Sequence, residues 1–578
     1  MARRDGAVHV VTTRRTYKGR VYETHLLRRS YRDGNRVRNE TVGNLSHLPA
    51  AVIDVIRRML HHEAVVPVDQ FEIVRSVPHG AVDAVLSTVR RLGLGAVLSA
   101  RPCREATLAV ALIASRVLEP HTKLATTRWW HTCTLAEELG VADATEDDLY
   151  RAMDWLVARQ ARIEQKLAAR HLKAGGLVLY DLTSTYMTGS HCPLAKRGYS
   201  RDDRRNSLQV NFGLITNADG CPVAVDVYDG NVADPSTFLP QVGTVRERFG
   251  LPDVVFVGDR GMIADKAIDE LRTQPSVGWI TALKTTQIRA LLGGPLQLGL
   301  FDERNLVGFL HPDYPGERLV ACRNPALAVR RAEKRQALLE ATTAELDKVR
   351  AMVARGRLRR REDIGVRVGR VINKYQVAKH FSLTIRDGHF TFTRRTARID
   401  AEAALDGIYI IRTNLPKRRL SDAAAVRAYK RLTRVERAFR TLKSIDLQVR
   451  PIHHRLPDRV RSHIFLCVLA YYVEWHMREA WRPLLFADEH PPVSRDPIAP
   501  AHRSVSADHK AARHETADGR PVHSFRTLLE TLSTIVRNHC RTRSTPEAPT
   551  FAVTTTATDT QRQALDLLKT IPQPAASM

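Results

Sequence analysis

The sequence predicts an α/β protein in which a sheet core is interrupted by an insertion and preceded by a mostly helical region. Two short apolar runs, Leu177–Tyr180 and Val254–Val257, each lead into an aspartate, as buried strands do where they leave a sheet. Segments of period two alternate with helical patterns after the first run. The 578 residues include 89 Lys and Arg against 62 Asp and Glu, a net charge of +27. This length predicts several domains, and this charge indicates a polyanionic partner such as nucleic acid.

Composition excludes several classes of protein. A hydrophobic content of 43% with 26% charged residues is typical of folded globular proteins rather than disordered ones. No apolar run approaches the roughly 18 residues of a membrane helix, and the start resembles no signal peptide. The seven cysteines form no CxxC pair, which favours reduced thiols. We therefore expect a cytoplasmic protein with no membrane partner.

The pattern along the chain predicts six segments. The first, 1–48, is a small β unit with a turn at 33–35, where DNA contact and a plain solvated surface are equally favoured. The others are a helical N-terminal region (49–172), the first part of the core (173–290), a β-rich insertion with a helical arm (291–425), the C-terminal helices of the core (426–485), and a linker and tail (486–578) with one amphipathic helix at 525–537.

The order of elements in the core predicts its topology. Strands are expected at 177–181, 207–216 and 222–228, a helix at 234–249, a strand at 254–257, a helix at 264–272 and a strand at 279–283. This is the order of the ribonuclease-H-like fold. It places Asp181 and Asp259 at the tips of the first and fourth strands.

A third acid, Glu436, lies on an unusually basic helix. Residues 426–462 contain eleven Lys or Arg and three acids. Rotation by about 100° per residue puts Leu432 on the buried stripe and Glu436 at its margin. Tyr429 and Lys443 fall within about 20° of Glu436, and Arg440 within about 40°. An acid in such a place suggests a cation held beside a phosphate.

Together, Asp181, Asp259 and Glu436 could hold Mg²⁺ or Mn²⁺, which prefer oxygen ligands. Two such ions about 4 Å apart would activate water and stabilise the leaving oxygen of a phosphodiester. Taken singly, each acid could equally be a helix cap or half of a surface ion pair. His453, His454 and His463 have no suitably spaced fourth ligand, so we expect them to be capping or DNA-facing residues rather than metal ligands.

The motifs around the three acids resemble those of bacterial insertion-sequence DDE transposases. They read LYDLTS at Asp181, VGDRGM at Asp259 and YKRLTRVERAFRTLK from Tyr429 to Lys443. The group they resemble is the insertion-sequence-four-like one, which carries a β-rich insertion before the Glu. Further matches are GYSRDDRR, DGNVADPSTF and DGIYIIRTN, so that the resemblance covers residues 175–480.

The resemblance implies a DNA transposase that cleaves element ends and joins their 3′-hydroxyls to target DNA, with double-stranded DNA as partner and a homodimer in the synaptic complex. The third motif departs from the family pattern at Leu432, where relatives carry Arg, and we propose that Arg440 supplies the missing phosphate contact. The expected DNA-binding side chains are Tyr429, Arg440, Lys443, Arg260, Arg434 and Arg437.

Two alternatives stay open. The first is a nuclease of the same fold without strand transfer, and the second is a DNA-binding protein whose catalytic site has decayed. Relatives use a Trp of the insertion to hold a flipped base, but residues 284–425 contain none. Tyr375, Phe381, Phe390, Phe392 and Tyr409 could stack on a base instead, although their alternation favours a role in the core.

Overall fold

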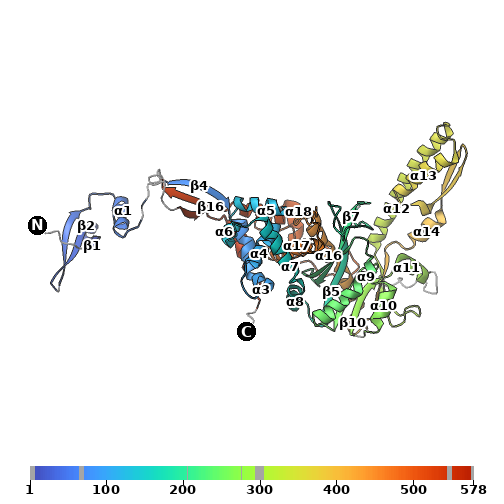
Figure 1. Cartoon of the computed structure of the whole chain (residues 1–578), viewed down its shortest axis with the longest axis horizontal. Helices are drawn as coiled ribbons and strands as arrows, with labels where there is room; N and C mark the ends of the chain where they lie inside the picture. Colours follow the sequence, from blue (N-terminus) through green and yellow to red (C-terminus); the bar gives the residue numbers. More distant parts are fainter. Residues whose placement is uncertain are drawn as a thin grey trace. The chain divides into compact units, whose positions relative to one another are not determined.

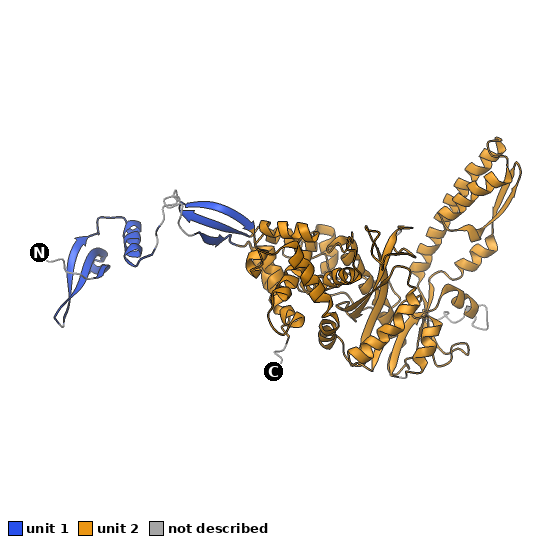
Figure 2. Cartoon of the chain, viewed as in Figure 1, with its two compact units in different colours: residues 1–77, 536–556 blue, residues 78–535, 557–578 orange. Residues whose placement is uncertain are grey.

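The computed structural model describes residues 7–574 except 35, 64, 66–70, 203, 205, 275, 293–304 and 543–549. The chain divides into two compact units (Figure 2). The first contains Met1–Val77 and Val536–Thr556, and the second contains Pro78–Ile535 and Ala557–Met578. None of the helices in the described ranges combines the length and apolar character that a bilayer span requires.

The first unit contains the predicted N-terminal β unit. Strands β1 (Ala7–Tyr17), β2 (Arg20–Asp33) and β3 (Arg36–Asn44) form an antiparallel sheet, and helix α1 (Ala50–Leu60) follows. The expected turn at 33–35 includes Asn35, which lies outside the described residues, while Gly34 has a φ of 62° that suits a tight turn. A second sheet pairs β16 (Val536–Thr542) with β17 (Phe551–Thr554) and β4 (Phe71–Pro78).

The second unit begins with the expected helices. Their apolar faces share one core with a long C-terminal helix, and Trp130 is buried there with its Nε1 donating to Ser115 Oγ at 2.8 Å. Trp130 is therefore a core residue. The helices are α2 (Gly80–Arg91), α3 (Leu94–Leu98), α4 (Arg104–Leu118), α5 (Lys123–Trp129), α6 (Leu135–Leu139), α7 (Glu146–Val157) and α8 (Gln160–His171).

The central sheet follows the predicted order of strands and helices. Strands β5, β9 and β10 run parallel, and β7 joins the other edge of β5 in the antiparallel sense. Helix α9 packs on this sheet through Phe238, whose ring lies 5.5 Å from that of Phe256 (Figure 1). The elements are β5 (Leu177–Tyr186), β6 (Lys196–Arg197), β7 (Leu208–Asn217), β8 (Pro222–Asp229), α9 (Asp234–Gly243), β9 (Val254–Val257), α10 (Asp265–Arg272) and β10 (Val277–Ala282).

The insertion differs from the expected β-rich subdomain. After α11 (Thr285–Leu292), strands β11 (Leu306–Phe309), β12 (Arg318–Arg323) and β15 (Ile408–Thr413) extend the central sheet in the order β11-β12-β15-β10-β9-β5-β7-β6, with β8 on β7. The part with its own hydrophobic core is mainly helical (Figure 1). It comprises α12 (Pro325–Ala354), α13 (Arg361–Lys374), the hairpin β13 (Phe381–Arg386) and β14 (His389–Arg394), and α14 (Thr396–Ala403).

The C-terminal helices of the core are confirmed, with one correction. The helix expected from 426 to 443 is interrupted at Arg431 and ends in a π-helical turn, Thr441–Ile445. The elements are α15 (Asp422–Lys430), α16 (Leu432–Arg440) and α17 (Pro457–Ala480). Leu432, Val435 and Phe439 are buried, as the rotation predicted, whereas Glu436, expected at the margin of the buried stripe, is exposed.

The prediction of a linker and tail at 486–578 is wrong for the described residues. Helices α18 (Val505–Arg513), α19 (Phe525–Ser533) and α20 (Asp559–Leu568) are ordered elements, and α19 and α20 contribute to the main core. Trp481 Nε1 donates to the carbonyl of Ala564 at 2.9 Å. The helix expected to reach 537 ends at Ser533, because Val536–Thr542 pairs as a strand with β17. The Pro-, Ser- and His-rich composition predicted a linker, because the apolar residues that pack this region against the core are few.

Candidate active site

Sheet register brings the first two acids together. Leu177, Val178 and Leu179 of β5 pair in parallel with Val255, Phe256 and Val257 of β9. Continuing this register by two residues sets Asp181 beside Asp259. The sequence predicted Asp181 as the last residue of its strand, but β5 continues along β7 as far as Tyr186. Its parallel partner β9 does end before the acid, at Val257, and Asp259 lies in the loop that follows.

The third acid lies on the helix that covers this face of the sheet. Asp181 is opposite Leu214 in the β5–β7 ladder, and Thr183 is opposite Phe212. These four side chains share one face, because alternate residues of a strand point the same way. The ring of Phe212 lies 5.5 Å from that of Phe439 on α16, at an interplanar angle of 87°. Asp181 therefore faces α16, the helix that carries Glu436.

Electrostatics supports the convergence of the three acids. Burial, the negative charge of Asp259 and, more weakly, that of Glu436 together raise the pKa of Asp181 to about 7. Burial and the same charges raise the pKa of Tyr429 to about 12, against an opposing effect of Arg260. Coulombic effects fall off with distance, so these effects indicate that the three carboxylates and the Tyr429 phenol lie near one another.

Backbone groups orient two of the carboxylates. Asp259 Oδ1 accepts hydrogen bonds from the backbone N–H groups of Gly261 and Met262, at 2.9 and 2.7 Å. A Cβ at Gly261 would lie 3.3 Å from that oxygen, so a side chain here would crowd the carboxylate. Asp181 Oδ1 accepts from the N–H of Leu182 at 2.8 Å. Both aspartates are thus held before any ligand arrives.

The donor set suits a hard divalent cation. All three groups are carboxylates, and the raised pKa of Asp181 reflects its burial and then the neighbouring negative charges, both of which a bound cation would offset. The three acids do not form a group whose ligand atoms all lie within 4.8 Å of one another; among the described residues, only His171, Cys221 and His476 do. Two ions about 4 Å apart would spread their ligands further than one ion does.

Comparison with known families identifies the chain. Residues 174–473, 300 of the 578, match the model of the transposase DDE domain, and residues 10–65 match the N-terminal domain of IS1634 family transposases. The chain belongs to the DDE transposases of bacterial insertion sequences. A solved structure of the piggyBac transposase synaptic complex with hairpin DNA is 8% identical, covers 86% of both chains and has a TM-score of 0.35. No curated protein matches the chain.

The basic residues expected at DNA in this DDE transposase fall into two groups. Lys443 and Arg434 have acidic partners: Lys443 Nζ lies 2.9 Å from Asp202 Oδ1, and Arg434 pairs with Asp219 in the β7–β8 turn. Burial lowers the pKa of Lys443, while Asp202 opposes that effect. The side chains of the second group, Arg260, Arg437 and Arg440, are exposed.

Sequence reasoning passed over one residue that acts on the acids. The positive charge of Arg201 lowers the pKa of Asp181, which places the guanidinium near the acids. Arg201 pairs with Asp234, its backbone N–H donates to Ser184 Oγ at 2.9 Å, and its buried Nη1 has no hydrogen-bond partner among the described residues. The signal was present in the GYSRDDRR motif, which had served only as support for the resemblance.

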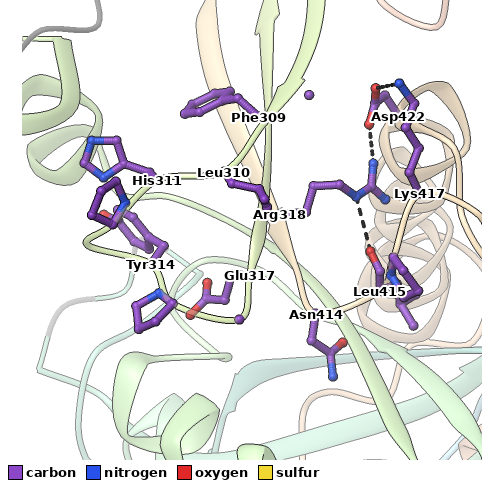
Figure 3. Close-up of a pocket in the computed structure, with 15 residues that line it drawn as sticks. Phe309, Leu310, His311, Tyr314, Glu317, Arg318, Asn414, Leu415, Lys417 and Asp422 are labelled. Carbon is purple, nitrogen blue, oxygen red and sulfur yellow. Dashed lines mark hydrogen bonds and ion pairs between the residues drawn. The ribbon is translucent and has the colours of Figure 1, made fainter.

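A concave site of the transposase lies away from the acids. It has a volume of about 760 Å³ at the β11–β12 turn, and none of the three acids lines it (Figure 3). Phe309, His311 and Tyr314 lie along one side, and Arg318 reaches across to Asp422 on the other. Because Arg318 is fully engaged with Asp422 and nearby carbonyls, the polar groups of this cavity hold the fold together.

The remaining sequence hypotheses concern histidines and aromatic rings. His463 is buried with its Nε2 at 2.8 Å from the carbonyl of Val449, and the ring of His454 lies edge-on to Tyr150. These contacts support a structural role for both. The five aromatic residues considered for base stacking all contribute to hydrophobic clusters, which confirms the expectation of a core role: Tyr375, Phe381, Phe390, Phe392 and Tyr409.

Proposed function

We propose that this transposase cleaves the DNA ends of its element and joins the 3′-hydroxyls to target DNA by metal-dependent phosphoryl transfer. Asp181, Asp259 and Glu436 would hold two Mg²⁺ or Mn²⁺ ions. The observation that carries the proposal is the effect of Asp259 and Glu436 on the pKa of Asp181, which ties together groups from β5, the β9 loop and α16. The strand order around them supports a ribonuclease-H-like core.

Bound divalent ions would lower the pKa of an attacking water and stabilise the leaving oxygen. The chain's own groups set the conditions for this. With a pKa of about 7, Asp181 must release its proton before it can serve as a ligand. Tyr429, with a pKa of about 12, keeps its phenolic hydrogen at neutral pH and can donate it to a phosphate oxygen.

Arginines on two sides of the acids suit a phosphodiester. Arg201 has an unpartnered Nη1 near Asp181, and Arg440 lies one helical turn beyond Glu436 on an exposed surface. Guanidinium groups bind phosphate in a bidentate manner and stay charged at all relevant pH values. We infer that Arg201 and Arg440 position the scissile strand. We further propose double-stranded DNA as the partner, a homodimer as the form that joins two ends, and the cytoplasm as the place of action.

The test is a pair of assays on DNA carrying the element's own ends. Wild-type protein with Mg²⁺ is expected to nick these ends, and Asp259→Asn to lose at least about 100-fold in rate, because it removes a ligand. Asp400→Asn, which changes an exposed acid of α14, should match the wild type. Equal nicking by Asp259→Asn and wild type would refute the assigned site.

Strand transfer separates the alternatives. Precleaved ends with free 3′-hydroxyls are mixed with target plasmid, and joined products are counted. Nicking without joining would establish a nuclease, and DNA binding without either reaction would establish a decayed enzyme. Arg440→Ala is expected to weaken end binding and to slow cleavage. Unchanged binding and cleavage in this variant would remove Arg440 from the site.

A further inference from the structure

A second group of metal-ligating side chains lies outside the carboxylate site. His171 ends α8, Cys221 directly precedes β8, and His476 lies on α17. One ligand atom from each lies within 4.8 Å of the others, and Cys221 Sγ is 4.0 Å from His476 Nε2. Three elements that are far apart in the sequence thus bring two imidazoles and a thiol to one point.

The geometry is close to that of a tetrahedral site. With bonds of about 2.3 Å to sulfur and about 2.0 Å to nitrogen, ligand atoms around zinc lie roughly 3.5 Å apart. The separation of 4.0 Å between Cys221 Sγ and His476 Nε2 needs only a small side-chain adjustment to reach this value. Cys221 is fully buried, whereas both histidines are partly exposed, so an ion can enter from the histidine side.

Neighbouring groups support this role. His171 Nε2 lies 2.9 Å from the hydroxyl of Tyr472, which leaves Nδ1 for an ion and provides the outer hydrogen bond typical of metal-binding histidines. The ring of Trp475 lies edge-on to His476 at 4.8 Å and fixes its orientation. Burial lowers the pKa of His171 to about 4 and that of His476 to about 3, so both are neutral ligands at pH 7.

One basic and two acidic side chains act on the cluster. Arg170 acts on both histidines and opposes a cation, whereas Asp219 and Glu479 act on Cys221 and favour one. Burial raises the pKa of the Cys221 thiol, so an ion must displace its proton to solvent, which would add a further negative charge at the sulfur that bonds to the ion. The resulting donor set of one thiolate and two imidazoles is borderline soft, which suits zinc-class ions and disfavours Mg²⁺.

We propose that His171, Cys221 and His476 bind one zinc-class divalent ion, with water in the fourth position. The ion would tie the N-terminal helices to the β7–β8 turn and to α17. That turn contacts α16, the helix that carries the third acid. Asp219 pairs with Arg434 on α16, and a Cβ at Gly220 would lie 3.0 Å from the Cβ of Arg434. The ion would therefore steady the helix that carries Glu436 without contacting the reacting DNA.

The test uses the tag-free full-length chain, stripped of metal by a chelator and kept reduced. Titration with Co²⁺ is expected to give an intense thiolate-to-cobalt charge-transfer band that saturates at one equivalent and disappears when Zn²⁺ is added. Cys221→Ser should abolish the band. His476→Ala, which keeps the thiol, should weaken Co²⁺ affinity at least about tenfold, as disturbed metal sites typically do.

Two controls make the result specific. Cys322→Ser changes another fully buried cysteine and should leave the band intact. Asp181→Asn changes the carboxylate site and should also leave it intact, so the outcome is independent of the proposed transposase chemistry. Absence of the band in the wild type, where folding is not in question, would overturn the proposal, as would its persistence in Cys221→Ser.

Discussion

The replacement Asp181→Asn is expected to stabilise the metal-free protein. The pKa of Asp181 lies at about 7 in the folded state against an ordinary 3.8, because of burial and the charges of Asp259 and Glu436. A carboxyl group with a raised folded pKa binds more protons when folded, so the stability of the fold falls as pH rises from about 4 to about 7. Above pH 7 the full penalty is present, and a neutral amide removes it.

The size of the effect follows from the same values. The difference between about 7 and 3.8 corresponds to about 4 kcal/mol, which partial exposure reduces, so we expect roughly 2 to 4 kcal/mol at pH 8. For a unit of this size, that is a rise in Tm of about 2 to 4 °C. At pH 5 the folded wild type already carries the proton, and the advantage should fall by more than half.

The assay is thermal unfolding in the presence of a chelator, at pH 5 and at pH 8, for wild type, Asp181→Asn and the exposed control Asp400→Asn. Added Mg²⁺ should then reverse the order, because it stabilises only a chain that can bind it. The reasoning fails if Asp181→Asn is no more stable than wild type at pH 8, or if its advantage is the same at both pH values.

Three further predictions concern the fold and its partner. Glu317→Gln removes the buried negative charge beside Arg412 and replaces one of the two oxygens that accept its hydrogen bonds, at 2.7 Å each, with an NH2 donor; it should cost about 3 to 5 kcal/mol in thermal unfolding, whereas the exposed Asp269→Asn should cost under about 1. Gly230→Ala would place a Cβ 2.0 Å from a backbone oxygen and should destabilise the protein by at least about 1 to 3 kcal/mol, whereas Gly243→Ala meets nothing within 4 Å and should not destabilise it; equal Tm values would contradict the packing. DNA binding measured by anisotropy should weaken linearly in log–log form as salt rises, and a flat dependence would argue against phosphate contacts.

Local patterns carried enough information to predict the core. Strand and helix order from Leu177 to Ala282 could be derived because each element is short, strongly patterned and bounded by turn residues. Asp181, Asp259 and Glu436 could be singled out because acids are unusual after apolar runs and on a basic helix. Their convergence is now supported by sheet register and by electrostatics.

The misses have a common physical origin in contacts between distant segments. The continuation of β5 past Asp181 depends on its ladder with β7, and the addition of β12 and β15 to the central sheet depends on pairing across most of the insertion. Arg201 lies in a loop whose position is set by Asp234 and Ser184. Periodicity within a window cannot reveal such partners.

The packing of α20 has a consequence for synthesis. Trp481 bonds to Ala564, and Arg91 of α2 donates through Nε and Nη2 to the carbonyl of Ile571, at 3.1 and 2.8 Å. The helical core is therefore completed by residues translated hundreds of positions after its first helix. This core can form fully only after those residues have been translated. We therefore expect a chain truncated before them to expose apolar surface rather than to fold as a shorter enzyme.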